Sequence, residues 1–112
     1  MSRSSVIKMI DGATTPSISN VFVNNVSTYC ALQITGTYST ATVAVQGVIT
    51  GNSQDWTDIA VFNLSNLEIK TADMTGNGIY QAAVEGIPNV RINVRAISGG
   101  SITVTANFGG RG

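Results

Sequence analysis

Residues 89–108 read NVRINVRAISGGSITVTANF, and this stretch decides the fold class. Apolar side chains alternate with polar ones from Val90 to Ala96, and again from Ile102 to Phe108. A period of two places the apolar residues of a strand on one face and the polar residues on the other. The Ser-Gly-Gly link at 98–100 supplies the positive φ angles that a tight turn needs. The stretch therefore predicts an antiparallel hairpin with one buried face and one solvent-exposed face.

The composition of the whole chain agrees with this prediction. The 112 residues include 12 Val, 12 Ile and 13 Thr, but only 3 Leu. Branching at Cβ suits a pleated sheet better than a helix. Turn-rich segments separate about eight or nine short strands at intervals of roughly 8–12 residues. We therefore predict one all-β domain over residues 1–112, an antiparallel β-sandwich or jelly roll of about eight strands, with residues 1–5 and 109–112 as flexible tails.

Two inner stretches differ in how clearly they indicate their register. Residues 42–49 are apolar on both faces, which is typical of a central strand. Residues 56–64 leave two alternatives open. Either Trp56, Ala60, Phe62 and Leu64 face the core, or Ile59 and Val61 do.

The surface is expected to carry little charge. Charged residues make up 11% of the chain and the net charge is zero, whereas a typical soluble domain has roughly 25% charged residues. Six basic against six acidic residues leave no electrostatic footprint for nucleic acid, and Arg91 and Arg95 are expected to solvate a strand face. A neutral surface resists association poorly. Either the surface is rich in Thr and Asn and stays exposed to solvent, or other protein chains cover much of it.

The N-terminus shows neither an export signal nor a membrane-spanning run, so no membrane association is predicted. The protein is expected to be made in the cytoplasm and to leave it only within an assembly.

The residue inventory argues against catalysis. The chain has no histidine, which excludes Ser-His-Asp and Cys-His arrangements. Its single cysteine, Cys30, can form no intrachain disulfide and no thiolate metal site. Cys30 falls at an apolar phase of a strand, so we expect a buried, inert thiol. The sequence predicts no enzyme activity, no metal and no cofactor.

The segment around Trp56 is the one candidate for small-molecule chemistry. Asp55 and Asp58 flank it, and paired carboxylates occur in glycoside hydrolases or, with the carbonyls of Asn52 and Gln54, in calcium sites. We favour a simpler interpretation, in which Asp residues cap a loop by bonding its own backbone. Trp56 itself either packs in the core or stacks on a sugar. In the second case the carbohydrate contacts would be Asn52, Gln54, Asp55 and Trp56.

Five segments between residues 43 and 104 follow a pattern seen in phage proteins. They are VAVQG at 43–47, WTDIA at 56–60, GIYQAAVEG at 78–86, VRINV at 90–94 and GGSITV at 99–104. This order resembles small structural proteins of tailed bacteriophages, such as head decoration proteins, head-fibre bases or tail accessory subunits.

The resemblance implies a non-enzymatic virion subunit that is made in the host cytoplasm. It would bind the major capsid protein or another virion protein in many copies, as a capsid decoration subunit, and would form a homo-oligomer, with a trimer favoured. The candidate contact arm is the N-terminal segment with Val6, Ile7, Met9 and Ile10. The alternative is a carbohydrate-binding module on a phage fibre or tail.

Overall fold

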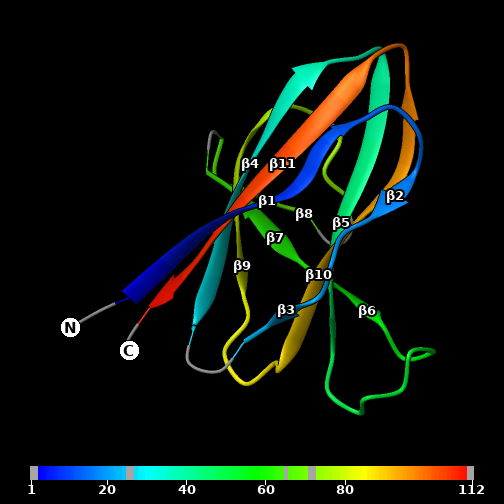
Figure 1. The fold of residues 1–112 in the computed structure, drawn as a ribbon. Coiled ribbons are helices and arrows are strands. Elements are labelled where there is room, and N and C mark those ends of the chain that lie inside the picture. The colour runs from blue at the N-terminus through cyan, green and yellow to red at the C-terminus, as the bar shows by residue number, and fades with distance from the viewer. Residues whose placement is uncertain (1–2, 25–26, 65, 71–72, 111–112) are drawn as a thin grey trace.

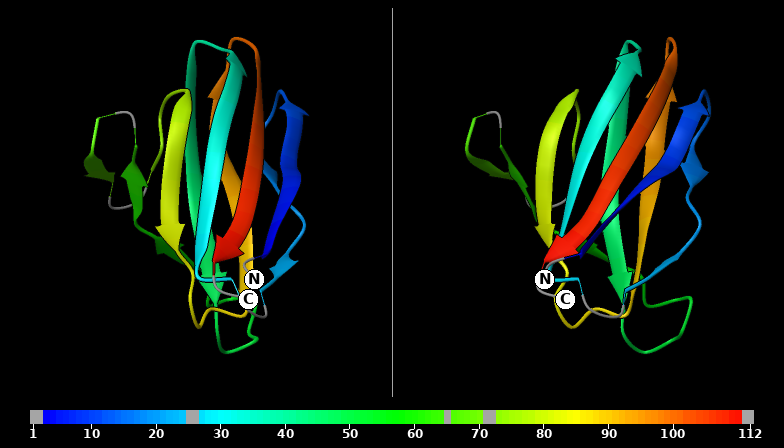
Figure 2. Two further views of the ribbon diagram at one scale, coloured as in Figure 1. Left: turned by 90° about the vertical axis from the view of Figure 1, so that its left-hand side faces the viewer. Right: turned by 60° about the vertical axis from the view of Figure 1, so that its left-hand side comes forward.

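The computed structural model describes residues 3–24, 27–64, 66–70 and 73–110. In this part of the chain two antiparallel sheets pack face to face as a β-sandwich (Figures 1 and 2), which confirms the all-β prediction. Sheet A has the order β1 (Arg3–Ala13), β11 (Ser101–Gly110), β4 (Tyr29–Thr37), β9 (Gly78–Ala83), β7 (Val61–Asn63) and β8 (Glu68–Lys70). Sheet B has the order β2 (Ser17–Ile18), β10 (Asn89–Ser98), β5 (Thr40–Val48) and β6 (Thr57–Ile59), and β3 (Phe22–Val23) also pairs with β10.

The predicted hairpin at residues 89–108 is wrong in its pairing. β10 lies in sheet B and β11 in sheet A, so the link between them crosses from one sheet to the other. The alternation itself is correct, because Val90, Ile92 and Val94 face Ile102 and Val104 across the core and all five are fully buried. β4 and β5 are joined by a crossing of the same kind, and the two crossings lie together at one end of the sandwich (Figure 2). Two strands that each have one buried face can stack face to face instead of pairing edge to edge.

The two crossings pack so closely that Gly100 has no room for a side chain. The Ser39 amide donates to the Ser98 carbonyl at 2.9 Å, and the Thr40 and Ser98 hydroxyls are 2.7 Å apart. Gly100 has a φ of +156°, and a Cβ there would collide with the Thr37 carbonyl. Backbone conformation and close approach therefore hold this crossing end, which comprises residues 36–40 and 98–101.

The opposite end of the sandwich is held by a side chain. Asn24, which is 8% exposed, donates through Nδ2 to the carbonyls of Val84 at 2.9 Å and Ile87 at 3.1 Å. The Oδ1 of Asn24 accepts from the Ser27 backbone amide at 2.9 Å, and the backbone amide of Asn24 donates to the Pro88 carbonyl at 2.7 Å. Asn24 thus ties the β3–β4 turn to the β9–β10 link. We call residues 24, 27–29, 49–56 and 84–89 the loop end.

The stretch at 56–64 forms two short strands instead of one. β6 belongs to sheet B and β7 to sheet A, with the break at Ala60. Val61 is 1% exposed and Ile59 packs against the core, so the second of the two predicted registers is the correct one. β5 lies between β10 and β6, which confirms it as an inner strand.

The N-terminal segment is a strand and not a free arm. β1 pairs along β11, from Arg3 opposite Gly110 to Ala13 opposite Ile102. The tails predicted at 1–5 and 109–112 are therefore too long, because residues 3–5 and 109–110 are paired in this ladder. Residues 1–2 and 111–112 lie outside the described part of the chain.

The core consists of the inward-facing residues of both sheets. Each buried valine or isoleucine stabilises the fold by roughly 1.5–3 kcal/mol relative to an exposed one. Phe22 stacks on Phe108 with ring centroids 3.7 Å apart, which joins β3 of sheet B to β11 of sheet A. Cys30 is fully buried, as predicted, and burial raises the pKa of its thiol to about 12. The largest fully buried side chains are Phe108, Leu32, Ile34, Met74, Ile92, Ile102, Val43, Val45, Val61, Val84, Val90 and Val94.

Candidate functional site

A row of polar side chains crosses the outer face of sheet B. Arg91 on β10, Gln46 on β5 and Asp58 on β6 are register partners. The Nε of Arg91 donates to Gln46 Oε1 at 2.9 Å, and Gln46 Nε2 donates to Asp58 Oδ1 at 3.0 Å. Gln46 is only 6% exposed, and these bonds satisfy both ends of its amide. The row therefore fixes the Arg91 side chain in one position.

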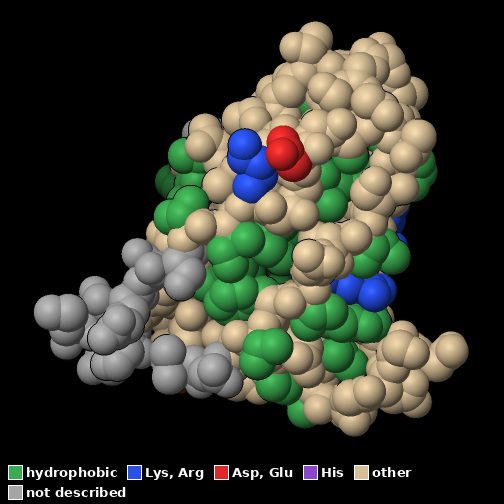
Figure 3. All heavy atoms as spheres, viewed as in Figure 1, with side chains coloured by type: hydrophobic (Ala, Val, Ile, Leu, Met, Phe, Trp, Pro, Cys, Tyr) green, Lys and Arg blue, Asp and Glu red, His purple; other side chains and the backbone are tan. Residues whose placement is uncertain are grey.

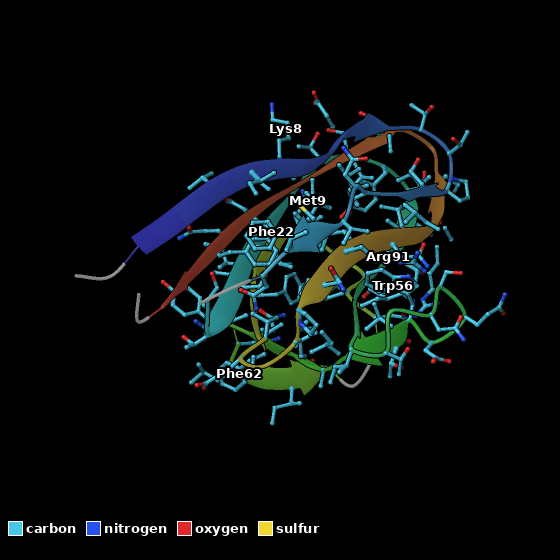
Figure 4. The ribbon with its side chains drawn as sticks, turned by 60° about the horizontal axis from the view of Figure 1, so that its bottom comes forward. Lys8, Met9, Phe22, Trp56, Phe62 and Arg91 are labelled. Atoms are coloured by element: carbon cyan, nitrogen blue, oxygen red, sulfur yellow. The ribbon has the colours of Figure 1, made fainter. Side chains whose placement is uncertain are left out.

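Arg91 in turn holds the ring of Trp56. Its Cζ lies 4.3 Å from the ring centroid, and Figure 4 shows the two side chains next to each other. Burial lowers the pKa of Arg91, but an arginine stays charged at neutral pH. A guanidinium over an indole contributes roughly 0.5–1 kcal/mol at an exposed site. Trp56 is thus a half-buried, oriented residue and not part of the core.

Arg95 extends the row to a second carboxylate. It pairs with Asp58, and its Nε donates to Asp73 Oδ1 at 3.1 Å. Burial acts to lower the pKa of Arg95, but the hydrogen bonds and charges of Asp73 and Asp58 raise it overall. Beside Asp73, Met74 exchanges two backbone hydrogen bonds with Val43 of β5, at 2.7 and 2.9 Å. Arg95 therefore clamps β6 and the segment before β9 onto the edge of β5.

An open groove of about 630 Å³ lies beside this row at the loop end. Gly47 is one of the lining residues. A Cβ at this position would lie only 2.7 Å from Ile87 Cγ2, so the wall of the groove has no room for a side chain here. Trp56 lines the groove, whereas Arg91 does not. The other lining residues are Val48, Ile49, Thr50, Gln54, Asp55, Thr57, Asp58, Ile59 and Ile87.

The four residues proposed to contact carbohydrate lie in one loop but have different roles. Asn52 Oδ1 accepts from the Gln54 amide at 2.9 Å, and Asp55 Oδ2 accepts from the Thr50 hydroxyl at 2.7 Å. Asn52 and Asp55 thus shape the loop, but Asp55 does so through the Thr50 hydroxyl and not through the backbone bond that the loop-capping interpretation predicts. Gln54, Asp55 and Trp56 line the groove, whereas Asn52 does not.

The two carboxylates beside Trp56 are both engaged. Asp58 bonds Arg95 and Gln46, and Asp55 bonds Thr50. Within the described residues no group of three or more His, Cys, Asp or Glu side chains is placed to hold a metal ion. The same part of the chain contains no helix long and apolar enough to cross a membrane.

A second feature is an apolar surface around β8, which we call the β8 surface and define as Phe62, Leu64, Leu67, Ile69 and Ile79. Phe62 on β7 pairs with Ile69 on β8, and the Leu64 amide donates to the Ile79 carbonyl at 2.9 Å. Leu67 is 72% exposed and Ile69 is 67% exposed. A groove of about 360 Å³ beside them is lined by Phe62 and Ile69 among others. The turn residue Leu67 has a φ of +59°, which is unusual for a bulky side chain.

Among the residues of the predicted contact arm, only Val6 is strongly exposed. It is 72% exposed on β1, whereas Ile7 and Met9 are partly buried and Ile10 is 5% exposed. Sequence reasoning missed the row from Arg91 to Asp73. Gln46 within an apolar strand and the alternating arginines of residues 89–96 were its only signals.

A family model named XepA matches residues 3–107. The chain belongs to the XepA family. The fold is similar to that of the SPBc2 prophage-derived protein YomS, with a TM-score of 0.87 and 16% identity over 98% of this chain and 96% of YomS. It is also similar to that of the PBSX exported protein XepA, with a TM-score of 0.88 and 12% identity over 97% of this chain. The present chain spans only 38% of that XepA chain.

At these identities the two structures establish the fold alone. No curated protein matches the sequence. The family and both structures are of phage origin, which agrees with the phage resemblance but does not distinguish head decoration from tail proteins.

Proposed function

We propose that this protein is a non-enzymatic virion subunit that attaches in many copies to a phage particle as a capsid decoration protein. The phage origin of its family supports this, as does the name of XepA, an exported protein of a prophage. A subunit bound to a particle would leave the host with it. The observation that carries the proposal is the β8 surface, which exposes Leu67 and Ile69. The protein would dock on the major capsid protein through this surface.

Leu67 is the most informative residue of the β8 surface. A non-glycine residue in the left-handed region costs roughly 1–2 kcal/mol, and asparagine or glycine adopts it more easily. The chain nevertheless has a leucine here and leaves it 72% exposed. A strained and exposed apolar side chain does not favour the isolated fold, so we infer that it contributes to contact with a partner.

The test combines a binding assay with a stability measurement. Recombinant protein is incubated with particles of the source phage that lack it, and binding is measured by co-sedimentation. We expect Leu67→Asn to weaken binding at least tenfold while raising the free energy of unfolding by about 0.5–1 kcal/mol, since strain is relieved. The control is Ile18→Asn, which removes an exposed isoleucine of sheet B, 56% exposed, far from β8 along the strand order. Particles that never bind the protein, or that bind Leu67→Asn equally well, would refute the proposal.

A second candidate is carbohydrate binding at the groove beside Trp56, on a phage fibre or tail. The supporting observation is the oriented indole, which Arg91 contacts and which also lines the groove. Sugars stack on aromatic faces and bond to neighbouring amide and carboxylate groups such as those of Gln54 and Asp55. Because Trp56 is the only tryptophan, its fluorescence reports binding directly. A glycan array and a titration that both leave the emission unchanged would eliminate this function.

A further inference from the structure

The turn Gly76-Asn77-Gly78 contains the one Asn-Gly pair of the sequence. The side-chain amide of asparagine is among the thermally labile groups of proteins. A glycine that follows it has no Cβ to keep its backbone nitrogen away from the asparagine side chain. Gly76 adds conformational freedom on the other side, because no atom lies within 4 Å of the position that its Cβ would take. The local sequence therefore favours a reaction of Asn77 with its own backbone.

The fold holds the Asn77 side chain against the end of β4 through both ends of its amide. The Tyr38 hydroxyl donates to Asn77 Oδ1 at 2.6 Å, and Asn77 Nδ2 donates to the Gly36 carbonyl at 3.0 Å. Directly after Asn77, Gly78 begins β9 and pairs with Ile34 of β4. Asn77 thus connects the start of β9 to the crossing end.

Two tyrosines hold this turn in place. Tyr38 packs against the core, and burial, followed by the interaction with Tyr80, raises the pKa of its hydroxyl. The Tyr38 hydroxyl therefore stays protonated, and able to donate, in mildly alkaline solution. Tyr80 fixes the preceding residue, since its own hydroxyl donates to the Gly76 carbonyl at 2.9 Å.

We propose that Asn77 is a site of spontaneous deamidation, which its hydrogen bonds to Tyr38 and Gly36 protect in the folded protein. In the reaction the Gly78 backbone nitrogen bonds to Asn77 Cγ, and Nδ2 leaves as ammonia with the proton of the Gly78 amide. Water then opens the resulting succinimide ring to aspartate or isoaspartate. The net change converts the side-chain amide and one water into a carboxylate and an ammonium ion. Rotation of the side chain toward the Gly78 nitrogen breaks both hydrogen bonds to the end of β4, so the reaction requires this contact to open first.

The product changes the crossing end in two ways. A carboxylate at position 77 has no hydrogen to donate to the Gly36 carbonyl, and isoaspartate adds one atom to the main chain just before the pair of Gly78 and Ile34. Residues 36–40 and 98–101 include no charged side chain, and in Figure 3 neutral side chains and backbone cover this end at the top of the view. Deamidation therefore loosens the contact between β4 and β9 and brings a negative charge to an uncharged end. It is independent of the proposed function, because neither Asn77 nor its hydrogen-bond partners belong to the β8 surface.

The experiment compares the rates of conversion at single asparagines. The folded protein is incubated in mildly alkaline buffer, and peptide mass mapping measures aspartate and isoaspartate at each position. We expect Tyr38→Phe, which removes the donor to Asn77 Oδ1, to raise the rate at Asn77 at least about threefold, as the loss of one hydrogen bond implies. Tyr29→Phe is the matched control and should leave the rate unchanged, because Tyr29 lies at the other end of β4 and pairs with Ala83. Asn52, which precedes a serine, is the internal reference in every sample.

Ion exchange of the intact protein gives a second readout, because the net charge is zero and each conversion adds one negative charge. Asn77→Gln keeps an amide but places its carbonyl carbon too far along the side chain to close the same ring, so the acidic form should disappear. An acidic form that persists in this variant, or that mass mapping assigns mainly to another asparagine, would show that Asn77 is not the site.

Circular dichroism shows whether each variant is folded. A folded Tyr38→Phe variant that converts Asn77 at the wild-type rate would overturn the proposal. If Tyr38→Phe does not fold, the wild type in urea takes its place, and equal rates at Asn77 in urea and in buffer would then exclude protection by the fold.

Discussion

The two ends of the sandwich are held together by different chemistry. At the crossing end, two links between the sheets pack backbone against backbone, and Gly100 has no space for a methyl group. At the loop end, the side chain of Asn24 makes the connection, and beside this end the row from Arg91 to Asp73 ties the strands of sheet B together. The groove and the oriented Trp56 belong to the loop end.

This difference separates residues on which the fold depends from residues that can vary. The crossing leaves no room for a side chain at Gly100, so substitution of this residue is expected to reduce the free energy of unfolding by a large amount. Side-chain hydrogen bonds can be removed one at a time at moderate cost. We therefore expect substitutions at the crossing end to abolish folding, and substitutions at the loop end to produce graded effects.

The largest effect is expected for Gly100→Ala. The added Cβ meets the Thr37 carbonyl and the φ of +156° is unfavourable for alanine, so the free energy of unfolding should fall by at least about 3 kcal/mol. Urea denaturation followed by circular dichroism measures this. The control is Gly76→Ala, where no atom lies within 4 Å of the new Cβ and the change should stay within about 0.5 kcal/mol. Equal stability of the two variants would show that the crossing is not tightly packed.

The next largest effect is expected for Asn24→Ala, at about 2–3 kcal/mol. The substitution removes the Asn24 donor from the carbonyls of Val84 and Ile87, although the Val84 carbonyl still accepts from the Ile87 amide at 3.0 Å. The same denaturation experiment measures it, with Asn20→Ala, an exposed asparagine of the neighbouring segment, as the control. A loss below 0.5 kcal/mol would mean that water replaces the amide, and the loop end would then not depend on this side chain.

A smaller effect, about 1 kcal/mol, is expected for Arg95→Met. The guanidinium is partly exposed, so water compensates for much of the lost pairing with Asp58 and Asp73. The change should be local, and amide hydrogen exchange at Met74 and Val43 should accelerate more than exchange in β4. Lys8→Met is the control, since its 3.9 Å pair with Asp11 is widely exposed. Unchanged exchange at Met74 would exclude the clamp.

The smallest effect on stability, about 0.5–1 kcal/mol, is expected for Arg91→Ala. Its signature is optical, because the guanidinium no longer covers the indole and the emission of Trp56 should shift to longer wavelength. Arg95→Met serves as the control, because it leaves Arg91 over the ring. If Arg91→Ala leaves the emission as in the wild type, the stacking does not orient Trp56 in solution.

Much of the fold could be predicted because alternation is a local property. The phases of residues 90–94 and 102–108 were correct, and so were the all-β class and the inner position of residues 42–48. Ala96 was expected on the buried face but is exposed, because the register shifts between Val94 and Ala96. The candidate site was less accessible. Asp55 was expected to stabilise its loop and does so through Thr50 instead of the backbone, but Gln46 and Asp73 were not found, because their partners lie on other strands and only the register brings them together.

The sequence by itself determined which face is buried in the strands that alternate clearly, such as residues 90–94 and 102–108, because a period of two assigns every side chain to one side or the other. Only the tertiary structure decided which strands are neighbours. The hydrogen-bonding groups along a strand edge belong to the backbone and are alike in every strand, so the stretch at 89–108 is equally compatible with a hairpin and with a crossing between sheets. The break at Ala60 has the same origin, because a chain can pass from sheet B to sheet A while its apolar phase remains directed at one core.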